Sequence, residues 1–131
     1  MTVEPFKAEH VREMLGEVYG ATGLEVQSAL AYTFRVDGVP VLCCGYVECG
    51  PHKALLWSFV TPDVQRYAKT VHVAATRFIS MMRHRRIEAT CRTGYEKGAA
   101  WLQRLGFECE GTMRAWAPDG TDYDLFARVR A

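Results

Sequence analysis

The chain has 131 residues, of which 49% are hydrophobic and 24% are charged, and its formal net charge is +1 at pH 7. This balance is typical of a soluble globular domain and gives no electrostatic reason to expect nucleic acid or a membrane surface as a partner. No apolar run approaches the roughly 20 residues of a membrane helix, and the start, MTVEPFKAEH, lacks the pattern of a secretory signal. We therefore expect one cytoplasmic domain over residues 1–131.

The first half of the chain begins with a short extended segment, Thr2 to Phe6, and then a helix whose apolar residues recur at intervals of three and four. Gly20 and Gly23 are expected to end that helix. Asp37-Gly38 lies between two apolar runs and predicts a tight β-hairpin. The other elements expected here are a short helix from Glu25 to Ala31 and strands from Tyr32 to Val36, Val39 to Glu48 and Lys53 to Val60.

The second half opens with the longest expected helix, Val64 to Arg83, which has one apolar face. Its basic end, Arg83 to Arg86, complements the helix dipole, and we prefer that explanation to a nucleic-acid surface. This helix would connect Lys53–Val60 to a parallel strand at Ile87. The remaining expected elements are a strand from Ile87 to Arg92, a helix from Lys97 to Leu105, and strands from Phe107 to Trp116 and Tyr123 to Val129. The order predicts an α/β fold with a mixed, mostly antiparallel sheet of six to seven strands and helices on both faces.

Five cysteines are present, an odd number that does not suit a disulfide framework. No Cys-x-x-Cys pair occurs, and Cys43 and Cys44 are neighbours whose side chains would face opposite sides of a strand. We therefore expect buried, reduced thiols and no metal site.

Two local motifs accompany this order of elements. Leu105-Gly106-Phe107 ends the last helix and is followed by Glu110-Gly111, and Val60-Thr61-Pro62 precedes the long helix with Gln65 three residues after the proline. In both motifs and in nearly its whole length, the chain resembles the GCN5-related N-acetyltransferase (GNAT) superfamily. Ala68 and Thr70 stand where that family has glycine or a small residue. The chain is also similar to a bacteriophage-encoded group of this superfamily, some of whose members resemble virion proteins. The shared features are Trp57, Thr61-Pro62-Asp63, and Trp101-Leu102 ahead of Leu105-Gly106-Phe107.

The resemblance implies acetyl-CoA as co-substrate. Its pantetheine would pair with the main chain of Phe59 and Val60, where this strand is expected to part from its parallel neighbour. Its pyrophosphate would meet exposed amides at the start of the long helix. Charge from Arg66 and Lys69 and the Thr70 hydroxyl could compensate for the missing glycines. The full expected cofactor set is Phe59, Val60, Gln65, Arg66, Tyr67, Ala68, Lys69 and Thr70.

Acetyl transfer to an amine needs a base for the amine and an acid for the leaving thiolate. Leu102 occupies the position of the family's usual tyrosine acid, so Tyr95 is the candidate acid, with loop packing as the alternative. Glu48, at the end of its strand, is the candidate base, and His52 in the following turn is a second one. Each could also be an ordinary solvated residue.

These residues predict an N-acetyltransferase that uses acetyl-CoA and acts on the amine of a protein or a small molecule. The alternative is a non-catalytic GNAT-like phage protein, either a virion component or a module that binds a host protein. A homodimer is compatible with both interpretations. A nucleic-acid binder that uses Arg83 to Arg86 is the least favoured.

Overall fold

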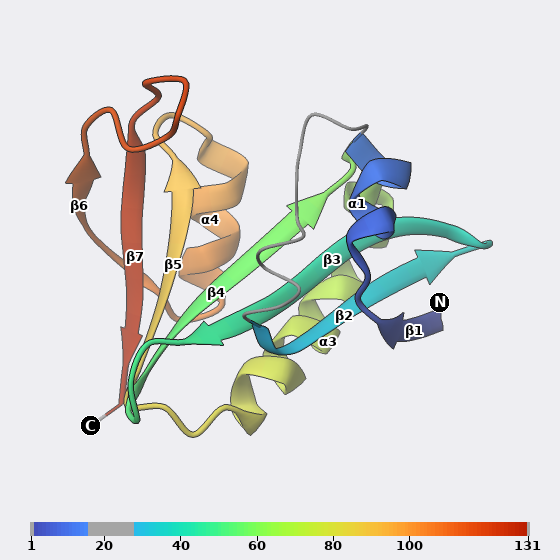
Figure 1. The fold of residues 1–131 in the computed structure, drawn as a ribbon, viewed down its shortest axis with the longest axis horizontal. Helices are drawn as coiled ribbons and strands as arrows, with labels where there is room; N and C mark the ends of the chain where they lie inside the picture. Colours follow the sequence, from blue (N-terminus) through green and yellow to red (C-terminus); the bar gives the residue numbers. More distant parts are fainter. Residues whose placement is uncertain (1, 16–27, 131) are drawn as a thin grey trace. The chain divides into compact units, whose positions relative to one another are not determined.

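The computed structural model describes residues 2–15 and 28–130. Seven strands form a sheet in the order β1-β2-β3-β4-β5-β7-β6, which is mixed and mostly antiparallel, as the sequence predicted. The elements shown in Figure 1 are β1 (Thr2–Pro5), α1 (Ala8–Leu15), β2 (Ser28–Val36), β3 (Val39–Glu48), β4 (Lys53–Val60), the 3₁₀ helix η1 (Pro62–Tyr67), α3 (Ala68–Met81), β5 (Arg86–Arg92), α4 (Glu96–Arg104), β6 (Glu108–Met113) and β7 (Tyr123–Val129).

Contacts group the chain into two compact units. The first comprises Met1–Glu48 with Leu56–Val73, and the second comprises Cys49–Leu55 with Ala74–Ala131. The boundary passes through β4 and through α3, so each of these elements contributes residues to both units. The expectation that residues 1–131 form a single domain stays a prediction.

The first unit is organised by the β2–β3 hairpin, which Figure 1 shows as two long neighbouring strands. Asp37 and Gly38 at its tip have φ angles of 51° and 78°, and Val36 pairs with Val39 across the turn. Positive φ at both central residues is what a two-residue hairpin turn requires, and it suits Asp-Gly. The hairpin predicted from Asp37-Gly38 is therefore confirmed.

The short helix expected from Glu25 to Ala31 is wrong over its described part. Ser28 to Ala31 belong to β2, where Leu30 pairs with Tyr46 and Ala31 with Gly45. The ladder to β3 supplies backbone hydrogen bonds to this segment, and such pairing overrides a weak local helix preference. Residues 25–27 and the expected helix breakers Gly20 and Gly23 lie outside the described residues.

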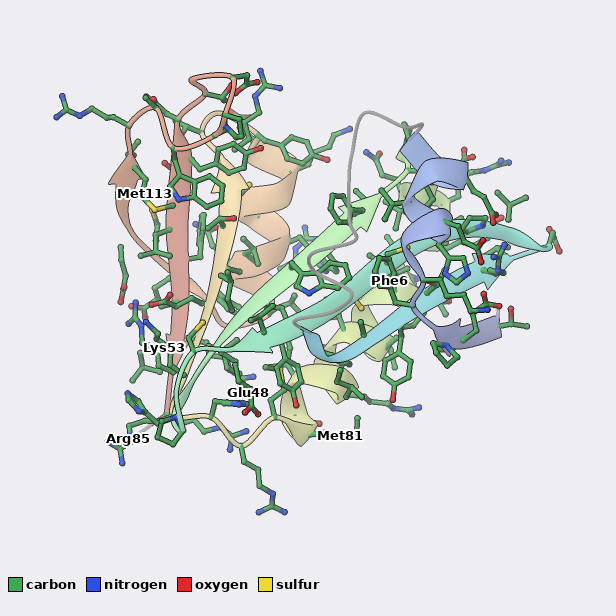
Figure 2. All side chains as sticks on the ribbon, in the orientation of Figure 1. Phe6, Glu48, Lys53, Met81, Arg85 and Met113 are labelled. Atoms are coloured by element: carbon green, nitrogen blue, oxygen red, sulfur yellow. The ribbon has the colours of Figure 1, made fainter. Side chains whose placement is uncertain are left out.

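The core of the first unit lies between α1 and the strands. Phe6, Val11 and Cys43 are buried, and Trp57 and Phe59 of β4 pack against them while remaining partly exposed. Phe6, labelled in Figure 2, meets the Trp57 indole edge to face, with ring centroids 5.0 Å apart. This aromatic contact is the arrangement that ring quadrupoles favour. It holds the end of β4 against the N-terminal segment.

The second unit is built on β7, which pairs with β5 on one side and β6 on the other, both antiparallel. Figure 1 shows β5, β7 and β6 side by side, and α4 contacts β5. The buried side chains come from β4, β5, β7, α3, α4 and the residues that follow the two helices, whereas β6 contributes none. They are Ala54, Phe78, Ile79, Met82, Ile87, Ala89, Cys91, Leu102, Leu105, Phe107, Phe126 and Ala127.

Several expected boundaries differ from those observed, most of them by one residue, and two elements besides β2 differ by more. The long helix expected from Val64 starts as the 3₁₀ helix η1, becomes α-helical at Ala68 and ends at Met81 instead of Arg83. Strand β6 ends at Met113 instead of Trp116, because the chain turns at Ala115, whose φ is 49°. Turns of this kind depend on backbone angles that periodicity does not report.

Candidate functional site

The candidate cofactor segment follows directly from β4. Phe59 and Val60 are the last two residues of that strand, and both are half-buried. The Phe59 ring lies 5.8 Å from the Trp57 indole, and Thr61 N–H donates to the Val41 carbonyl of β3 at 3.1 Å. Packing and a main-chain bond therefore fix the strand end that leads into η1.

The backbone of η1 is tightly wound. Thr61 caps it in an extended conformation, Pro62 opens it, and Val64 N–H donates to Thr61 O at 3.0 Å. At its end the Ala68 N–H donates to Gln65 O, three residues back, as 3₁₀ geometry requires. Ala68 occupies the position of the family's first glycine. Its amide already has an acceptor in the chain, so a phosphate contact there would have to replace that bond.

The side chains of this segment are more accessible to a ligand than the backbone amides of Val64 and Ala68 are. Gln65, Arg66, Lys69 and Thr70 are exposed, and Tyr67 is half-buried. Residues three and four apart are neighbours on a helix surface, so Lys69 and Thr70 both lie near Arg66. Two cations and a hydroxyl at the start of α3 could hold an anion, although Asp63 places a carboxylate in the preceding turn.

The candidate base, Glu48, is exposed at the end of β3 in the first unit (Figure 2). The turn that follows is closed by Cys49 N–H, which donates to Lys53 O at 2.8 Å. His52, the second candidate, is exposed within this turn, and its carbonyl accepts from Arg86 N–H at 3.0 Å. Both side chains can therefore reach solvent, which a base acting through water would need.

The candidate acid, Tyr95, lies at the start of α4 in the second unit and is 47% exposed. Its ring packs over Gly98, where an added Cβ would come within 2.8 Å of the Tyr95 ring and 2.9 Å of Cys91 Sγ. Its carbonyl accepts from Ala99 N–H at 3.2 Å and from the Cys91 thiol at 3.7 Å. Tyr95 is thus held over the first turn of α4 because Gly98 has no side chain.

Leu102, at the family's usual acid position, is a core residue. It is buried in α4, and its carbonyl accepts from Phe107 N–H at 3.0 Å, while Gly106 N–H donates to Gln103 O at 3.0 Å. With the φ of Gly106 at 93°, these two bonds form a Schellman motif. Leu102 therefore serves packing and helix termination.

Comparisons with known proteins bear on this arrangement. No family model matches the chain, and no curated protein matches it in sequence. Ard1 from Thermoplasma volcanium has a TM-score of 0.80 at 13% identity, with 99% of this chain and 97% of that chain covered. The ribosomal-protein-S18-alanine N-acetyltransferase from Escherichia coli has a TM-score of 0.74 at 14% identity, covering 98% and 92%. A GNAT-family acetyltransferase from Bacillus anthracis has a TM-score of 0.68 at 14% identity, covering 97% and 93%.

The chain has the fold of the GNAT superfamily. Within this GNAT fold, β4, η1 and the start of α3 carry the candidate cofactor residues of the first unit. Glu48 belongs to the first unit and Tyr95 to the second. The expected parting of β4 from β5 involves both units and stays a prediction.

The first unit holds a hydrogen-bonded row of polar side chains that the sequence did not predict, formed by Glu4, His10 and Thr33, which we call the buried polar row. His10, 3% exposed, has Nδ1 2.6 Å from Thr33 Oγ1, and its Nε2 lies 2.8 Å from Glu4 Oε1. Lys7 N–H donates to the same Nδ1 at 3.2 Å, so Nδ1 accepts and the imidazole proton is on Nε2, where it donates to Glu4. A carboxylate, an imidazole and a hydroxyl in line resemble a catalytic array, but Thr33 is 0% exposed and cannot meet a substrate.

The row continues in both directions. Thr33 Oγ1 lies 3.4 Å from Cys43 Sγ, whose thiol donates to Met14 Sδ at 3.3 Å. Arg35 lies 3.2 Å from both Glu4 and Glu13, and these carboxylates raise its pKa, the Glu13 bond most. The residues involved lie in α1 and three strands and share no motif, so only their contacts could reveal them.

The five cysteines differ in how exposed they are. None of the five cysteines forms a disulfide; Cys43 and Cys91 are buried, whereas Cys49 and Cys109 are exposed, contrary to the expectation that all would be buried. Burial raises the pKa of Cys44 to about 12 and also raises the pKa of Cys43 and Cys91.

In residues 2–15 and 28–130 no group of three or more His, Cys, Asp or Glu residues could hold a metal. None of the helices in the same residues is long and apolar enough to cross a membrane.

Proposed function

We propose that the chain is an N-acetyltransferase that moves an acetyl group from acetyl-CoA to an amine. The observation that carries this proposal is the exposed polar segment that follows β4 in a GNAT fold, with Arg66, Lys69 and Thr70 on neighbouring turns. A diphosphate is a doubly charged anion, so two cations and a hydroxyl at a helix start suit it. The proposed donor is acetyl-CoA because that segment would hold its diphosphate.

The proposed cofactor contacts follow the order of the chain. The main chain of Phe59 and Val60 would pair with the amide groups of pantetheine, as an added strand does. Arg66 and Lys69 would neutralise the diphosphate, with the Thr70 hydroxyl as a further donor. Gln65, Tyr67 and Ala68 would line the same segment. Because the Ala68 amide is already bonded to Gln65 O, side chains must do more of the phosphate binding here than glycine amides would.

The proposed chemistry needs two proton transfers, one to a base and one from an acid. Glu48, or else His52, would remove a proton from the acceptor ammonium group directly or through water, which leaves a neutral amine to attack the thioester carbonyl. Tyr95 would then give its phenolic proton to the leaving thiolate. Its position over Gly98 leaves nearly half of the side chain exposed for that transfer.

The acceptor is proposed only as a class. One structural neighbour is named for an alanine of a ribosomal protein and another for spermidine, so a protein amine and a small-molecule amine are both kept. We propose neither nucleic acid nor membrane as a partner of this reaction. The proposed setting is a single cytoplasmic domain, as a monomer or a homodimer.

Titration calorimetry with CoA and acetyl-CoA tests the cofactor proposal. We expect the double variant Arg66→Ala/Lys69→Ala to bind either ligand at least about tenfold more weakly than the wild type, because two charge-assisted contacts are lost. Arg114→Ala, an exposed cation next to β6, serves as the matched control and should bind like the wild type. No heat from the wild type at millimolar acetyl-CoA would overturn the proposal.

A second candidate is a non-catalytic GNAT-like protein of a bacteriophage, acting as a virion component or a host-protein-binding module. The observations that favour it are the engaged Ala68 amide and the threonine at position 70 in place of a small residue. If the wild type binds no CoA yet copurifies with phage particles or with one host protein, this candidate replaces the enzyme. Binding of CoA at micromolar concentration would exclude it.

A further inference from the structure

Three segments of the second unit meet at one end of its strands. Arg86 N–H donates to His52 O at 3.0 Å, and Arg130 N–H donates to Arg85 O at 2.8 Å. The Arg130 guanidinium also donates to Met82 O at 2.6 Å. These bonds join the turn before β4, the link between α3 and β5, and the end of β7. The joined backbone segments carry five cations, which we call the basic surface: Lys53, Arg83, Arg85, Arg128 and Arg130 (Lys53 and Arg85 are labelled in Figure 2).

The charges of the basic surface are not neutralised within the part of the chain that the structure describes. None of its five residues forms an ion pair there, whereas the neighbouring Arg86 is bonded to both Glu88 and Glu110. The formal net charge is 16 − 15 = +1, so five cations here leave 1 − 5 = −4 for the rest of the chain. A nearly neutral total therefore conceals a local excess of positive charge, even with Glu108 paired opposite Ala127 near the end of β7.

The composition of this surface distinguishes between two kinds of polyanion. Four of its five cations are arginines, whose planar guanidinium matches a carboxylate or a phosphate with two parallel hydrogen bonds, so the choice depends on what lies beside them. Met81, two residues before Arg83, is 67% exposed at the end of α3. Exposed methionine together with arginine is typical of protein interfaces, whereas a surface for a phosphate backbone needs charge and hydrogen-bond donors only.

We propose that the basic surface binds an acidic segment of another protein through arginine–carboxylate pairs, with Met81 meeting an apolar side chain of that segment. This interaction does not use the residues proposed for cofactor binding or proton transfer. Cations on an interface chiefly accelerate association and select the partner. Binding should therefore weaken steeply with salt.

Fluorescence anisotropy tests this with two labelled probes, poly-L-glutamate and a DNA duplex of similar charge, at about 50 mM salt. We expect the wild type to prefer poly-L-glutamate, and Arg83→Glu/Arg85→Glu to bind it at least about tenfold more weakly. Arg92→Glu/Arg114→Glu makes the same change of charge beside the turn between β6 and β7, and it should retain binding. Circular dichroism checks that both variants fold, and Arg83→Gln/Arg85→Gln replaces the first if it does not.

The outcomes separate the alternatives. Absent binding of poly-L-glutamate, or equal loss in both charge-reversal variants, would overturn the proposal, because the surface would then have no special role. A preference for the duplex would also overturn it and would assign the surface to nucleic acid. Titration of acetyl-CoA into Arg83→Glu/Arg85→Glu should match the wild type, so this proposal and the cofactor proposal can fail separately.

Discussion

His10 of α1 connects Glu4 of β1 and the Lys7 amide to Thr33 of β2, which is 23 residues away in the sequence. It bonds Glu4 through Nε2, and Thr33 and the Lys7 amide through Nδ1. An intramolecular hydrogen bond contributes about 1 kcal/mol, but a buried group left without a partner costs about 1–3 kcal/mol. Removing one member of the row would leave a buried polar group without a partner. We therefore assign the row to the stability of the first unit.

Thr33→Val tests that assignment at the level of one hydroxyl. Valine preserves the shape of the side chain and removes the hydroxyl next to His10 Nδ1 and Cys43 Sγ. We expect the free energy of unfolding to fall by about 1–2 kcal/mol, measured by urea denaturation. Thr112→Val, where the hydroxyl is exposed, should change it by less than about 0.5 kcal/mol. Equal stability of wild type and Thr33→Val would show that the row contributes little.

At the scale of elements, the Leu105-Gly106-Phe107 motif has a physical explanation. Gly106 supplies the positive φ at which α4 ends, and Leu102 and Phe107 are both buried beside the two closing hydrogen bonds. A hydrophobic contact of this kind commonly accompanies a Schellman motif. The motif therefore sets the direction in which the chain enters β6, whatever the function of the protein is.

Two strands of the second unit are also linked by charge. Arg86 of β5 forms a two-bond pair with Glu110 of β6 and a bond to Glu88 at 2.7 Å. The pair raises the pKa of Arg86 and lowers the pKa of Glu110 below its ordinary value. Because the fold favours the ionised carboxylate, the contribution of Glu110 to stability is complete above the ordinary glutamate pKa and is lost as pH falls through the lowered pKa.

Glu110→Gln should therefore destabilise the protein at neutral pH only. We expect its melting temperature to lie roughly 1–4 °C below that of the wild type at pH 7, a small effect because the pair is exposed. The gap should close as the pH falls below about 4, where the wild-type carboxylate becomes protonated. Melting curves at several pH values measure it. A gap that is independent of pH would mean that packing, and not charge, is responsible.

At the scale of the whole molecule, the five thiols report on both units. Cys49 and Cys109 are exposed, whereas Cys43 and Cys91 are buried and Cys44 has its pKa raised to about 12. Only a thiolate reacts readily, so burial and a raised pKa both protect a cysteine.

Titration with a chromogenic disulfide reagent at pH 7 follows from these environments. We expect Cys49 and Cys109 to react quickly in the folded protein and the other three to react only after unfolding. Cys49→Ser/Cys109→Ser should leave almost no fast reaction. A rapid signal in that variant would show that Cys43, Cys44 or Cys91 is accessible, which would contradict the protection expected for these three thiols.

Much of this architecture could be predicted from the sequence, because it depends on local signals. Alternation and helical spacing located β3, β4 and β7 with the observed bounds, and Asp37-Gly38 and Gly106 marked turns that need positive φ. The candidate residues Phe59 to Thr70 follow one another along the chain, so a motif could propose them together. Tyr95 was proposed from the resemblance to the family and Glu48 from its position at the end of a strand, and their roles stay predictions.

Apart from the helix expected from Glu25 to Ala31, the sequence alone determined the order of the described elements, because most strands, helices and turns are specified by neighbouring residues. Tertiary structure decided three other features. It made Ser28 to Ala31 a strand through pairing with β3, placed His10 against Thr33 inside the first unit, and brought Lys53 near the arginines that precede β5 and those at the end of β7. Each depends on contacts between distant residues, and such contacts exist only after the chain has folded.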